Sequence, residues 1–501
     1  MKNKVFILAS AVVLGCIGYA AYQNWHNAQQ KKNSTVTHYT RAEMDSIQTS
    51  LQDKKYRAPK FENASLLKDV PSAKVWDEKL QKEVPVSVWD SWPVTDRDGA
   101  VANYHGYRLV IGLTAKGDRG DDSGVKLGMY AQKISDKEDD ISTWKYLGDV
   151  FSDFGEGRDL SKEDYNLDHI KSEWSGSTTM MNSNDQTLRL FYTNAWNKEQ
   201  RQALTTAQIA VEPKDGTDWA SGLTINHQKA TDHKTVFTGD GEIYQKAEQA
   251  VAMNGVTDSF AMRDPHFVIE NGKYYLAFEG NTGPKSGDYQ GDNNFKQSKY
   301  YGLNAFFKTE KKRLEADKKS EEYARAYLSN SAMGKIELNS DFTLKKVMKP
   351  MVTSNATHDM MERPNLVKYK GRWYLFASVW GIYFATSDQN LQKQNFMLGW
   401  VSDDGINGTY KPLNGNALVL ASSLPMNAPD FTYSYLALPS NRKDKSEFVV
   451  TAFQANKTFA PSIRVKVNGD RTSVVNNSVL NQGAVIDSGH YYQAKAQKIN
   501  Y

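Results

Sequence analysis

Three acidic residues lie in short segments whose neighbours suit a carbohydrate-binding site. Asp90 stands between two indoles in the segment Val88–Pro93, and Asp264 and Glu362 each adjoin an arginine, with a proline close by. An indole can stack on the C–H face of a sugar ring while a carboxylate meets the anomeric carbon, and a pair of carboxyl groups can break a glycosidic bond. Each segment alone is equally typical of a turn or of a structural ion pair at a strand end. The prediction therefore depends on whether the three segments meet.

The side chains suggest a division of roles among these acids. Glu362 has the longer reach and the higher reference pKa, so burial would make it the better proton donor. Asp90 is interpreted as the nucleophile because of its tryptophan neighbours, which is the arrangement of a retaining enzyme. Asp264 is left to hydrogen-bond sugar hydroxyls as positive charge develops on the ring. The proline after each of Arg263 and Arg363 indicates an irregular strand from which the arginine can also reach the pocket.

Other chemistries find little support in the sequence. The histidines, among them His105, His266 and His358, match no zinc motif, and there is no serine-nucleophile elbow or phosphate-binding loop. The single cysteine, Cys16, lies in the apolar N-terminal run, which excludes a disulfide within the chain. With 62 basic and 58 acidic residues and no basic stripe, nucleic-acid binding is not expected.

The elements that must position the acids are predicted to be strands. One strand-like segment of apolar and aromatic residues, which we term the aromatic phrase, occurs five times. A polar or aromatic cluster precedes each copy. The phrases are Gly106–Ile111, Leu188–Tyr192, Gly272–Phe278, Gly371–Phe376 and Glu447–Phe453. The clusters are Trp89-Asp90, Glu173–Ser175, Arg263–Pro265, Glu362–Pro364 and Phe431–Ser434. Since the innermost strand of every propeller blade lines the axis, we predict an all-β, five-bladed β-propeller whose clusters converge on one central pocket.

Around this domain the chain has distinct segments. Two lysines precede an apolar run from Val5 to Tyr22, so residues 1–22 are expected to be an export signal or membrane anchor, with lipidation at Cys16 as a further possibility. The protein is therefore expected outside the cell, secreted or tethered to the outer face of the membrane. Residues 23–60 are interpreted as a polar stalk and lead-in, 61–490 as the catalytic propeller and 491–501 as a tail. A capping box predicts a helix from Thr40 through Leu51, and a charged helix on the surface is expected over Thr309–Tyr327.

The motifs in combination resemble the levansucrase/inulosucrase family of bacterial fructansucrases over about Val84–Gln482. The segments that carry the resemblance are Val88–Pro93, Asn103–Tyr107, Glu173–Ser177, Arg263–His266, Phe278-Glu279, Tyr289–Gly291 and Glu362–Asn365. The resemblance implies a five-bladed propeller, sucrose as donor, a covalent fructosyl intermediate on Asp90, stabilisation by Asp264 and acid/base catalysis by Glu362. It also implies fructan, oligosaccharide or water as acceptor, and we expect a monomer.

Further site residues follow from the resemblance. Those expected to line the sugar subsites are Trp89, Trp174, Ser175, Arg263, Glu279 and Tyr433, with Arg363 and Trp380 added as neighbours of the pocket. A structural Ca²⁺ is implied, with ligands at Asp258, Gln290, Leu328 through its carbonyl, Asn330 and Asp359. All of these are oxygen donors, as calcium requires.

The chain departs from the family pattern on the side of the leaving group and acceptor. Met360 stands where relatives usually carry an acid, Trp380 where an arginine faces the glucosyl unit, and Tyr383 near the place of a lysine. Loss of an arginine hydrogen bond costs on the order of 1.5 to 3 kcal/mol, so an altered acceptor preference is expected. A mainly hydrolytic β-fructofuranosidase or a synthase of short oligosaccharides is the alternative, and a catalytically silent glycan-binding propeller is a third hypothesis.

Overall fold

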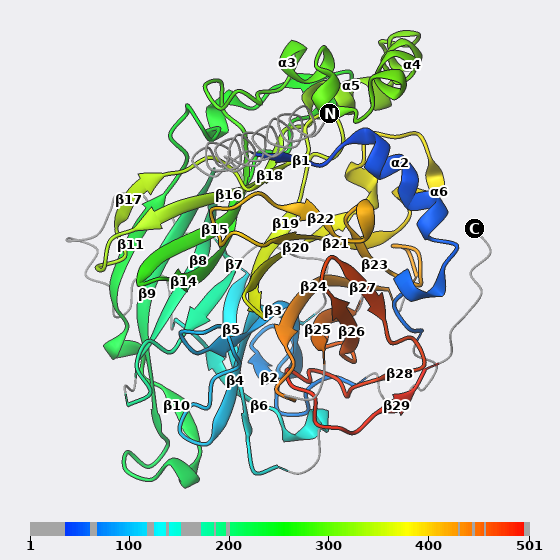
Figure 1. Cartoon of the computed structure of the whole chain (residues 1–501). Coiled ribbons are helices and arrows are strands. Elements are labelled where there is room, and N and C mark those ends of the chain that lie inside the picture. Colours follow the sequence, from blue (N-terminus) through cyan, green and yellow to red (C-terminus); the bar gives the residue numbers. More distant parts are fainter. Residues whose placement is uncertain are drawn as a thin grey trace, which may run out of the picture.

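The structure is a computed structural model of the chain (Figure 1). It describes residues 36–60, 68–117, 125–136, 140–151, 172–184, 187–196, 201–428, 431–442, 446–454 and 457–494. The expected export segment, residues 1–22, and Cys16 lie outside the described residues. Among the helices that are described, none combines the length and the apolar character needed to cross a bilayer.

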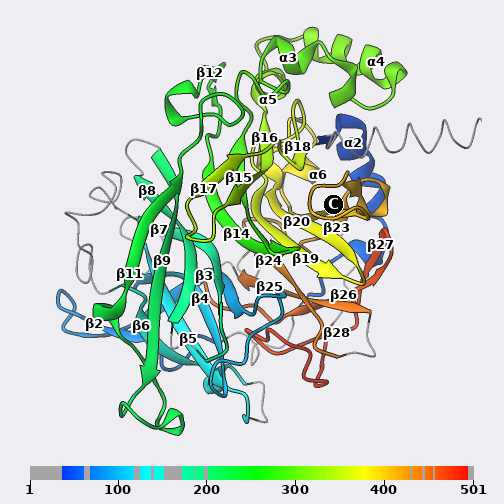
Figure 2. The same cartoon turned by 60° about the vertical axis from the view of Figure 1, so that its left-hand side comes forward.

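The fold is a five-bladed β-propeller, as predicted, and the blades follow one another around the molecule in chain order (Figures 1 and 2). Blade 1 contains β3 (Lys82–Thr95), β4 (Tyr107–Lys116), β5 (Lys126–Lys133) and β6 (Lys145–Asp149), with β2 (Lys74–Asp77) on β3. Blade 2 contains β7 (Ser172–Thr179), β8 (Thr187–Trp196), β9 (Arg201–Pro213), β10 (Leu223–Ile225) and β11 (Thr231–Phe237). A short parallel pairing of β3 with β7 joins these two blades into one sheet.

The other three blades are separate sheets. Blade 3 contains β14 (Met262–Glu270), β15 (Lys273–Asn281), β16 (Ser331–Leu338), β17 (Leu344–Val347) and β18 (Val352–Thr353), extended by β1 (Thr37–His38). Blade 4 contains β19 (Glu362–Tyr369), β20 (Arg372–Trp380), β21 (Asn395–Ser402), β22 (Lys411–Pro412) and β23 (Leu418–Ala421). Blade 5 contains β24 (Thr432–Pro439), β25 (Glu447–Gln454), β26 (Ile463–Asn468) and β27 (Arg471–Val474). Two small hairpins are β12 (Ala252–Met253) with β13 (Val256–Thr257) and β28 (Ser478–Val479) with β29 (Tyr492–Gln493).

Aromatic side chains on the sheet faces hold neighbouring blades together. Phe191 of blade 2 stacks on Phe267 of blade 3, with ring centroids 4.9 Å apart. Phe448 of blade 5 meets the rings of Tyr374 and Phe376 of blade 4 edge-on at 5.4 and 5.6 Å. Such edge-to-face and stacked pairs add to the burial of apolar area that drives folding. The aromatic phrases in the sequence are thus explained by contacts between blades.

The repeated pattern maps onto the same two strands of every blade. Each aromatic phrase forms the second strand, namely β4, β8, β15, β20 and β25. Each polar cluster lies in the first strand, namely β3, β7, β14, β19 and β24, except that Phe431 immediately precedes β24. These first strands contact one another in sequence, β7 with β14, β14 with β19 and β19 with β24, and β24 also contacts β3. They therefore form the inner wall of the propeller, and the clusters face a common axis.

Helices are confined to the edge of the propeller. The expected helix at Thr40–Leu51 is confirmed as α2 (Arg41–Ser50), with Thr40 as N-cap of a complete capping box. The single helix expected over Thr309–Tyr327 is instead two helices, α4 (Asn304–Glu315) and α5 (Glu321–Leu328), because Ser320 starts the second with its own cap. Two shorter helices in the described residues are α3 (Asp292–Phe295) and α6 (Gln389–Gln392), and α3, α4 and α5 stand together at one end (Figure 2).

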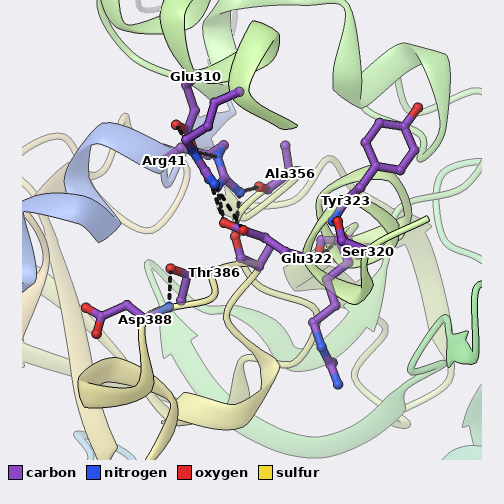
Figure 3. Close-up of polar contacts among 12 residues, drawn as sticks. Arg41, Glu310, Ser320, Glu322, Tyr323, Ala356, Thr386 and Asp388 are labelled. Atoms are coloured by element: carbon purple, nitrogen blue, oxygen red, sulfur yellow. Dashed lines mark hydrogen bonds and ion pairs between the residues drawn. The ribbon is translucent and has the colours of Figure 1, made fainter. Parts of the chain in front are cut away.

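Residues 36–60 pack against the propeller, although the sequence indicated a polar stalk. Arg41 at the start of α2 is 1% exposed and donates from Nη1 to the carbonyls of Ala356 and Ala385 at 2.7 and 2.8 Å. Its Nη2 lies 2.6 Å from Glu310 Oε1 and 3.7 Å from Glu322 Oε1 (Figure 3). A buried guanidinium that meets both carbonyls and carboxylates is fully paired, so α2 is fastened to the helical edge of blade 3.

The charges on α4 and α5 are therefore not only a solvated face, which corrects the interpretation from sequence. Glu310 and Glu322 also bind Arg313, which bridges the two helices. Burial alone would raise the pKa of Glu310, but the hydrogen bonds and charges of Arg313 and Arg41 lower that pKa to about 2. The two helices and α2 thus meet in one charged cluster, in which Glu310 remains ionised at neutral pH.

Candidate active site

Every inner strand is irregular at the position of its functional cluster. The pairing of each first strand with the second strand of its blade shifts register there, between Trp89 and Trp92 in β3 and at the matching points of β7, β14, β19 and β24. A β-bulge bends a strand and re-aims its side chains. Neighbouring residues of one strand can therefore serve one pocket, which a regular strand does not allow.

Left-handed backbone marks four of these bulges. Asp90, Asp264, Arg363 and Ser434 have φ of 44°, 58°, 54° and 61°, a region that residues other than glycine rarely adopt. Strain of this kind costs of order 1 to 3 kcal/mol per residue and persists only where the surrounding structure enforces it. In blade 2 the bulge instead contains Gly176, where a Cβ would lie 1.9 Å from the backbone oxygen of Phe191 in β8. The chain thus tolerates strained backbone at the same level of four blades and has a glycine in the bulge of blade 2.

A cavity of about 700 Å³ opens above the bulges. Nine of the residues expected in the site line this cavity: Trp89, Asp90, Trp174, Ser175, Arg263, Asp264, Glu362, Trp380 and Tyr433. They come from all five blades, so the structure brings together residues that are far apart in the sequence. The cavity is the place where the three acids meet.

Glu362 lies at the first residue of β19 and is held by donors from three strands. Its Oε2 accepts hydrogen bonds from the hydroxyl of Tyr433 and from Nε1 of Trp380 at 3.1 Å. Its Oε1 lies 3.3 Å from Nη2 of Arg263. Burial, opposed by the charge of Arg263 and reinforced by the negative charges of Asp264 and Asp90, raises the pKa of Glu362 to about 7. A carboxyl group of this acidity can exchange a proton near neutral pH, as a general acid/base must.

Asp90 and Asp264 are placed by contacts from neighbouring blades. Ser175 donates to Asp90 Oδ2 at 3.2 Å, and the backbone N–H of Arg363 donates to Asp264 Oδ2 at 2.8 Å. Thr193 accepts the N–H of Asp264 at 2.9 Å and was not identified from sequence, because a threonine inside an apolar strand carries no functional signal. Burial raises the pKa of Asp264, while Arg263 opposes that rise. Both aspartates are thus fixed in position before substrate binds.

Two of the expected residues lie behind the cavity wall. Glu279 is fully buried and pairs with Arg263 through two contacts of 2.8 and 2.9 Å. Arg363 differs from the expectation that it reaches the pocket: its Nη2 donates to the carbonyl of Ser91 at 2.9 Å and its Nη1 to Ser434. The positive φ at Arg363 turns its side chain into the seam between blades 1, 4 and 5. Both residues support the site without lining it.

Comparisons with known proteins decide the family. The levansucrase/invertase family model matches residues 28–486. The chain belongs to this family. It is 38% identical to the levansucrases of Bacillus amyloliquefaciens and Bacillus subtilis (strain 168), across 96% of this chain and 97% and 96% of theirs. The crystal structure of Bacillus subtilis levansucrase superposes with a TM-score of 0.79 over 90% of this chain and 98% of that one, at 38% identity.

Not every relative in the family is described as an active enzyme. A protein of Geobacillus stearothermophilus described as an inactive levansucrase is 37% identical over 96% of this chain and 96% of its own. Membership in the levansucrase/invertase family therefore identifies the scaffold, and the acids in the cavity must carry the argument for activity. In this member of the family all three are present and face the same cavity.

A second cluster contains the residues expected to bind calcium. Asp258, Gln290, Asn330 and Asp359 are all buried, and Asn330 follows Leu328 at the end of α5 by two residues. Gln290 Oε1 and Asp359 Oδ1 have no hydrogen-bond partner in this part of the structure. Burial raises the pKa of Asp258, and the nearby Asp359 adds to the rise. Two close acids, together with the unpartnered buried oxygens of Asp359 and Gln290, fit a bound cation, which would supply the missing positive charge.

The three departures from the family pattern all line the same part of the cavity. Met360, Trp380 and Tyr383 contribute to its wall, beside Ile382. Trp380 is the last residue of β20, and Gly381–Tyr383 form the 3-10 turn that follows. Trp380 lies beside Glu362, to whose Oε2 its Nε1 donates at 3.1 Å.

Proposed function

We propose that this chain is a fructosyltransferase that cleaves sucrose by a retaining double displacement. The observation that carries the proposal is the position of Glu362, whose carboxyl group is held by Arg263, Trp380 and Tyr433 in the cavity that Asp90 and Asp264 also line. Family membership supports sucrose as the substrate, since relatives that are 38% identical over nearly the whole chain are levansucrases. The remaining steps follow from the chemistry of these side chains.

In the first step Asp90 acts as nucleophile. One of its carboxylate oxygens attacks the anomeric carbon of the fructosyl unit, and the bond from that carbon to the glucosyl oxygen breaks. Glu362 donates its proton to that oxygen, so glucose leaves as a neutral alcohol. The pKa of about 7 keeps a substantial fraction of Glu362 protonated at neutral pH. The fructosyl unit is then held as an ester on Asp90.

In the second step Glu362 works as a base. It takes the proton of an acceptor hydroxyl, whose oxygen attacks the anomeric carbon while the bond to Asp90 breaks. Two inversions at one carbon give net retention. Asp264 is fixed by the N–H of Arg363 and stabilises the positive charge that develops on the ring in both transition states. Water as acceptor gives hydrolysis, and a sugar hydroxyl gives transfer.

The test of this proposal is the variant Asp90→Asn, with Asp470→Asn as the matched control at an exposed acid. We expect Asp90→Asn to lose sucrose turnover, measured as glucose release, by at least about a thousandfold while its melting temperature stays near that of the wild type. The control is expected to keep full activity. Undiminished glucose release from Asp90→Asn would refute the assignment, and a wild type that binds sucrose without releasing glucose would favour the glycan-binding hypothesis.

The balance between transfer and hydrolysis is a separate property of the same site. Every turnover releases one glucose, whereas free fructose appears only when water is the acceptor. Comparing glucose with free fructose during sucrose turnover therefore measures the transferred fraction. Equal amounts would identify a mainly hydrolytic β-fructofuranosidase, and an excess of glucose would identify a transferase that makes fructan or oligosaccharides.

A structural Ca²⁺ is proposed at Asp258, Gln290, Asn330 and Asp359, with the carbonyl of Leu328 as a further ligand. The unpartnered oxygens of Gln290 and Asp359 support this assignment. The ion would neutralise two buried carboxylates and fix the loops that carry them. We expect Ca²⁺ to raise the melting temperature of the wild type and chelator to lower it. Asp359→Asn should lose this response, and an unchanged melting temperature with and without Ca²⁺ would contradict the assignment.

The location and assembly of the protein are likewise proposals. The lysines and the apolar run Val5–Tyr22 support export, with the catalytic domain secreted or held at the outer face of the membrane. The domain is proposed to act as a monomer on sucrose, because the inner strands of a single chain bring Asp90, Asp264 and Glu362 to one cavity. Fractionation of producing cells and light scattering of the purified protein test these two statements.

A further inference from the structure

The cavity has two chemically different parts. Its charged lining residues are Asp90, Asp264, Glu362, Arg263 and Lys457. Lys457 lies 4.1 Å from the ring centre of Trp89, beside the nucleophile's strand. On the side of Trp380 the lining consists of apolar and aromatic residues, and no charged residue lines the cavity there in the described chain. The boundary between the two parts is Glu362.

The uncharged part is a continuous wall. Trp380 lies against Tyr433, with ring centroids 3.8 Å apart, and meets Phe431 edge-on at 5.9 Å. Ile382 follows Trp380 in the 3-10 turn and is 46% exposed, which is high for an isoleucine beside a catalytic cavity. Met426 also lines the cavity, and its N–H is bound to the carbonyl of Lys393 next to this turn. Together Trp380, Ile382, Met426, Phe431 and Tyr433 form what we term the aromatic wall.

The aromatic wall borders the atom that exchanges the proton. Both Trp380 and Tyr433 donate to Oε2 of Glu362. Any oxygen that receives or gives the proton of Glu362 must approach this carboxyl group, so the body attached to that oxygen lies against the wall. With the indole N–H and the Tyr433 hydroxyl already bound to Glu362, the wall presents ring faces and aliphatic carbon to that body. Ring faces favour flat apolar groups and the C–H faces of sugars.

We propose that the aromatic wall is an aglycone subsite that selects acceptor alcohols with a planar apolar body, such as aryl-methyl alcohols, over small alcohols of similar reactivity. This inference rests on the proposed function and names its acceptor class. The acceptor oxygen attacks the anomeric carbon of the fructosyl unit, its bond to Asp90 breaks, and the hydroxyl proton passes to Glu362. The product is an aryl-methyl β-fructofuranoside, and no further reactant is required.

The test measures how the fructosyl intermediate is partitioned between an alcohol and water. Wild-type protein is supplied with sucrose and with benzyl alcohol or methanol at equal concentration, and fructoside is compared with free fructose. Both products come from the same intermediate, so the ratio does not depend on how fast that intermediate forms. We expect the ratio to favour benzyl alcohol over methanol by about tenfold or more, because a phenyl ring buries far more apolar area than a methyl group.

Three variants test the origin of this preference. Trp380→Ala and Phe431→Ala are expected to bring the two alcohols within about twofold of each other, since each removes a ring from the wall. Phe431 makes no hydrogen bond to Glu362, so its variant still reports on the wall if loss of Trp380 damages catalysis. Trp76→Ala, at a tryptophan that is 51% exposed on β2, is the matched control and should keep the wild-type preference.

Each outcome has a distinct meaning. Equal partitioning of the two alcohols by the wild type would overturn the subsite while glucose release continued, and so would an unchanged preference in both wall variants. Absence of glucose release from sucrose in the wild type would instead overturn the proposed function, and this inference with it. Loss of the preference in the two wall variants alone would establish the assignment.

Discussion

Replacing Tyr433 with phenylalanine gives the sharpest prediction about the acidity of Glu362. The hydroxyl of Tyr433 donates to Oε2 of Glu362, while its ring lies against Trp380 at an interplanar angle of 36°. Tyr433→Phe removes the hydroxyl and keeps the ring, so the packing of the aromatic wall is retained. A donor to a carboxylate stabilises the charged form and lowers its pKa. The variant should therefore raise the pKa of Glu362 above its value of about 7.

The size of the shift follows from the strength of the lost contact. A hydrogen bond to a charged group contributes about 1.5 to 3 kcal/mol, and one pKa unit corresponds to about 1.4 kcal/mol, which gives about one to two units. The donors Trp380 and Arg263 remain in place at 3.1 and 3.3 Å, so the lower end is expected. Glu362 must be protonated to release glucose. The alkaline limb of kcat/KM for sucrose should consequently move upward by about one pH unit.

The assay is initial glucose release at low sucrose concentration across the pH range in which the protein stays folded. Tyr410→Phe is the matched control, because that buried hydroxyl donates to the carbonyl of Ile406 in blade 4 and does not line the cavity. Its alkaline limb should coincide with that of the wild type. An alkaline limb of Tyr433→Phe that stays in place or moves to lower pH would refute the view that Tyr433 sets the acidity of Glu362.

Three other perturbations test the supports of the site. Arg41→Met removes one of the two arginines that pair with Glu310 and Glu322 and should cost about 1.5 to 3 kcal/mol of unfolding free energy. Because the pKa of Glu310 is lowered to about 2, the part of the wild-type stability that Glu310 supplies should be present above pH 4.5 and lost as pH falls toward 2. Glu279→Gln removes the buried counter-ion of Arg263 and should lower kcat/KM by tenfold or more in the glucose assay, with protein still folded by circular dichroism. Gly176→Ala should prevent soluble expression or lower the melting temperature markedly, because its Cβ has no room at 1.9 Å from a backbone oxygen.

The architecture was predictable because its signal is periodic. Each blade repeats an aromatic second strand such as Gly371–Phe376, and these rings are needed in every blade to pack against the next. The repeated pattern of hydrophobic residues can therefore be recognised in the sequence even where long loops separate the copies. The packing of residues 36–60 was harder to predict from the sequence, because this segment is polar on average. Only a few of its side chains, Tyr39, Met44 and Ile47 among them, are buried at the edge of the propeller. The average polarity of a segment does not reveal which few of its side chains are buried.

The site was predictable in its members but not in its connections. Asp90, Asp264 and Glu362 stand out by residue type and neighbours, and the structure places all three on the cavity. Arg363 has the same local pattern as Arg263, yet one guanidinium pairs with acids and the other with backbone carbonyls. The difference arises at the bulges, where φ is positive at Asp264 in one strand and at Arg363 in the other. The arginine therefore precedes the left-handed position in β14 and occupies it in β19, a difference of residue order that composition does not show.

The position of Glu362 directly before the left-handed residue of β19 also explains why its acidity depends on several blades. In β14 the residue before the left-handed position, Arg263, points into the cavity, and in β19 the residue before it is Glu362 itself. Arg263 belongs to blade 3, Trp380 to the blade of Glu362, and Tyr433 to blade 5, which closes the propeller against blade 1. A change that loosens β24 would therefore withdraw the hydroxyl of Tyr433 before it unfolds the domain. A weakened contact between blade 5 and blade 1 should then appear first as a higher pKa of Glu362. A lower melting temperature should appear only when the contact is weakened further.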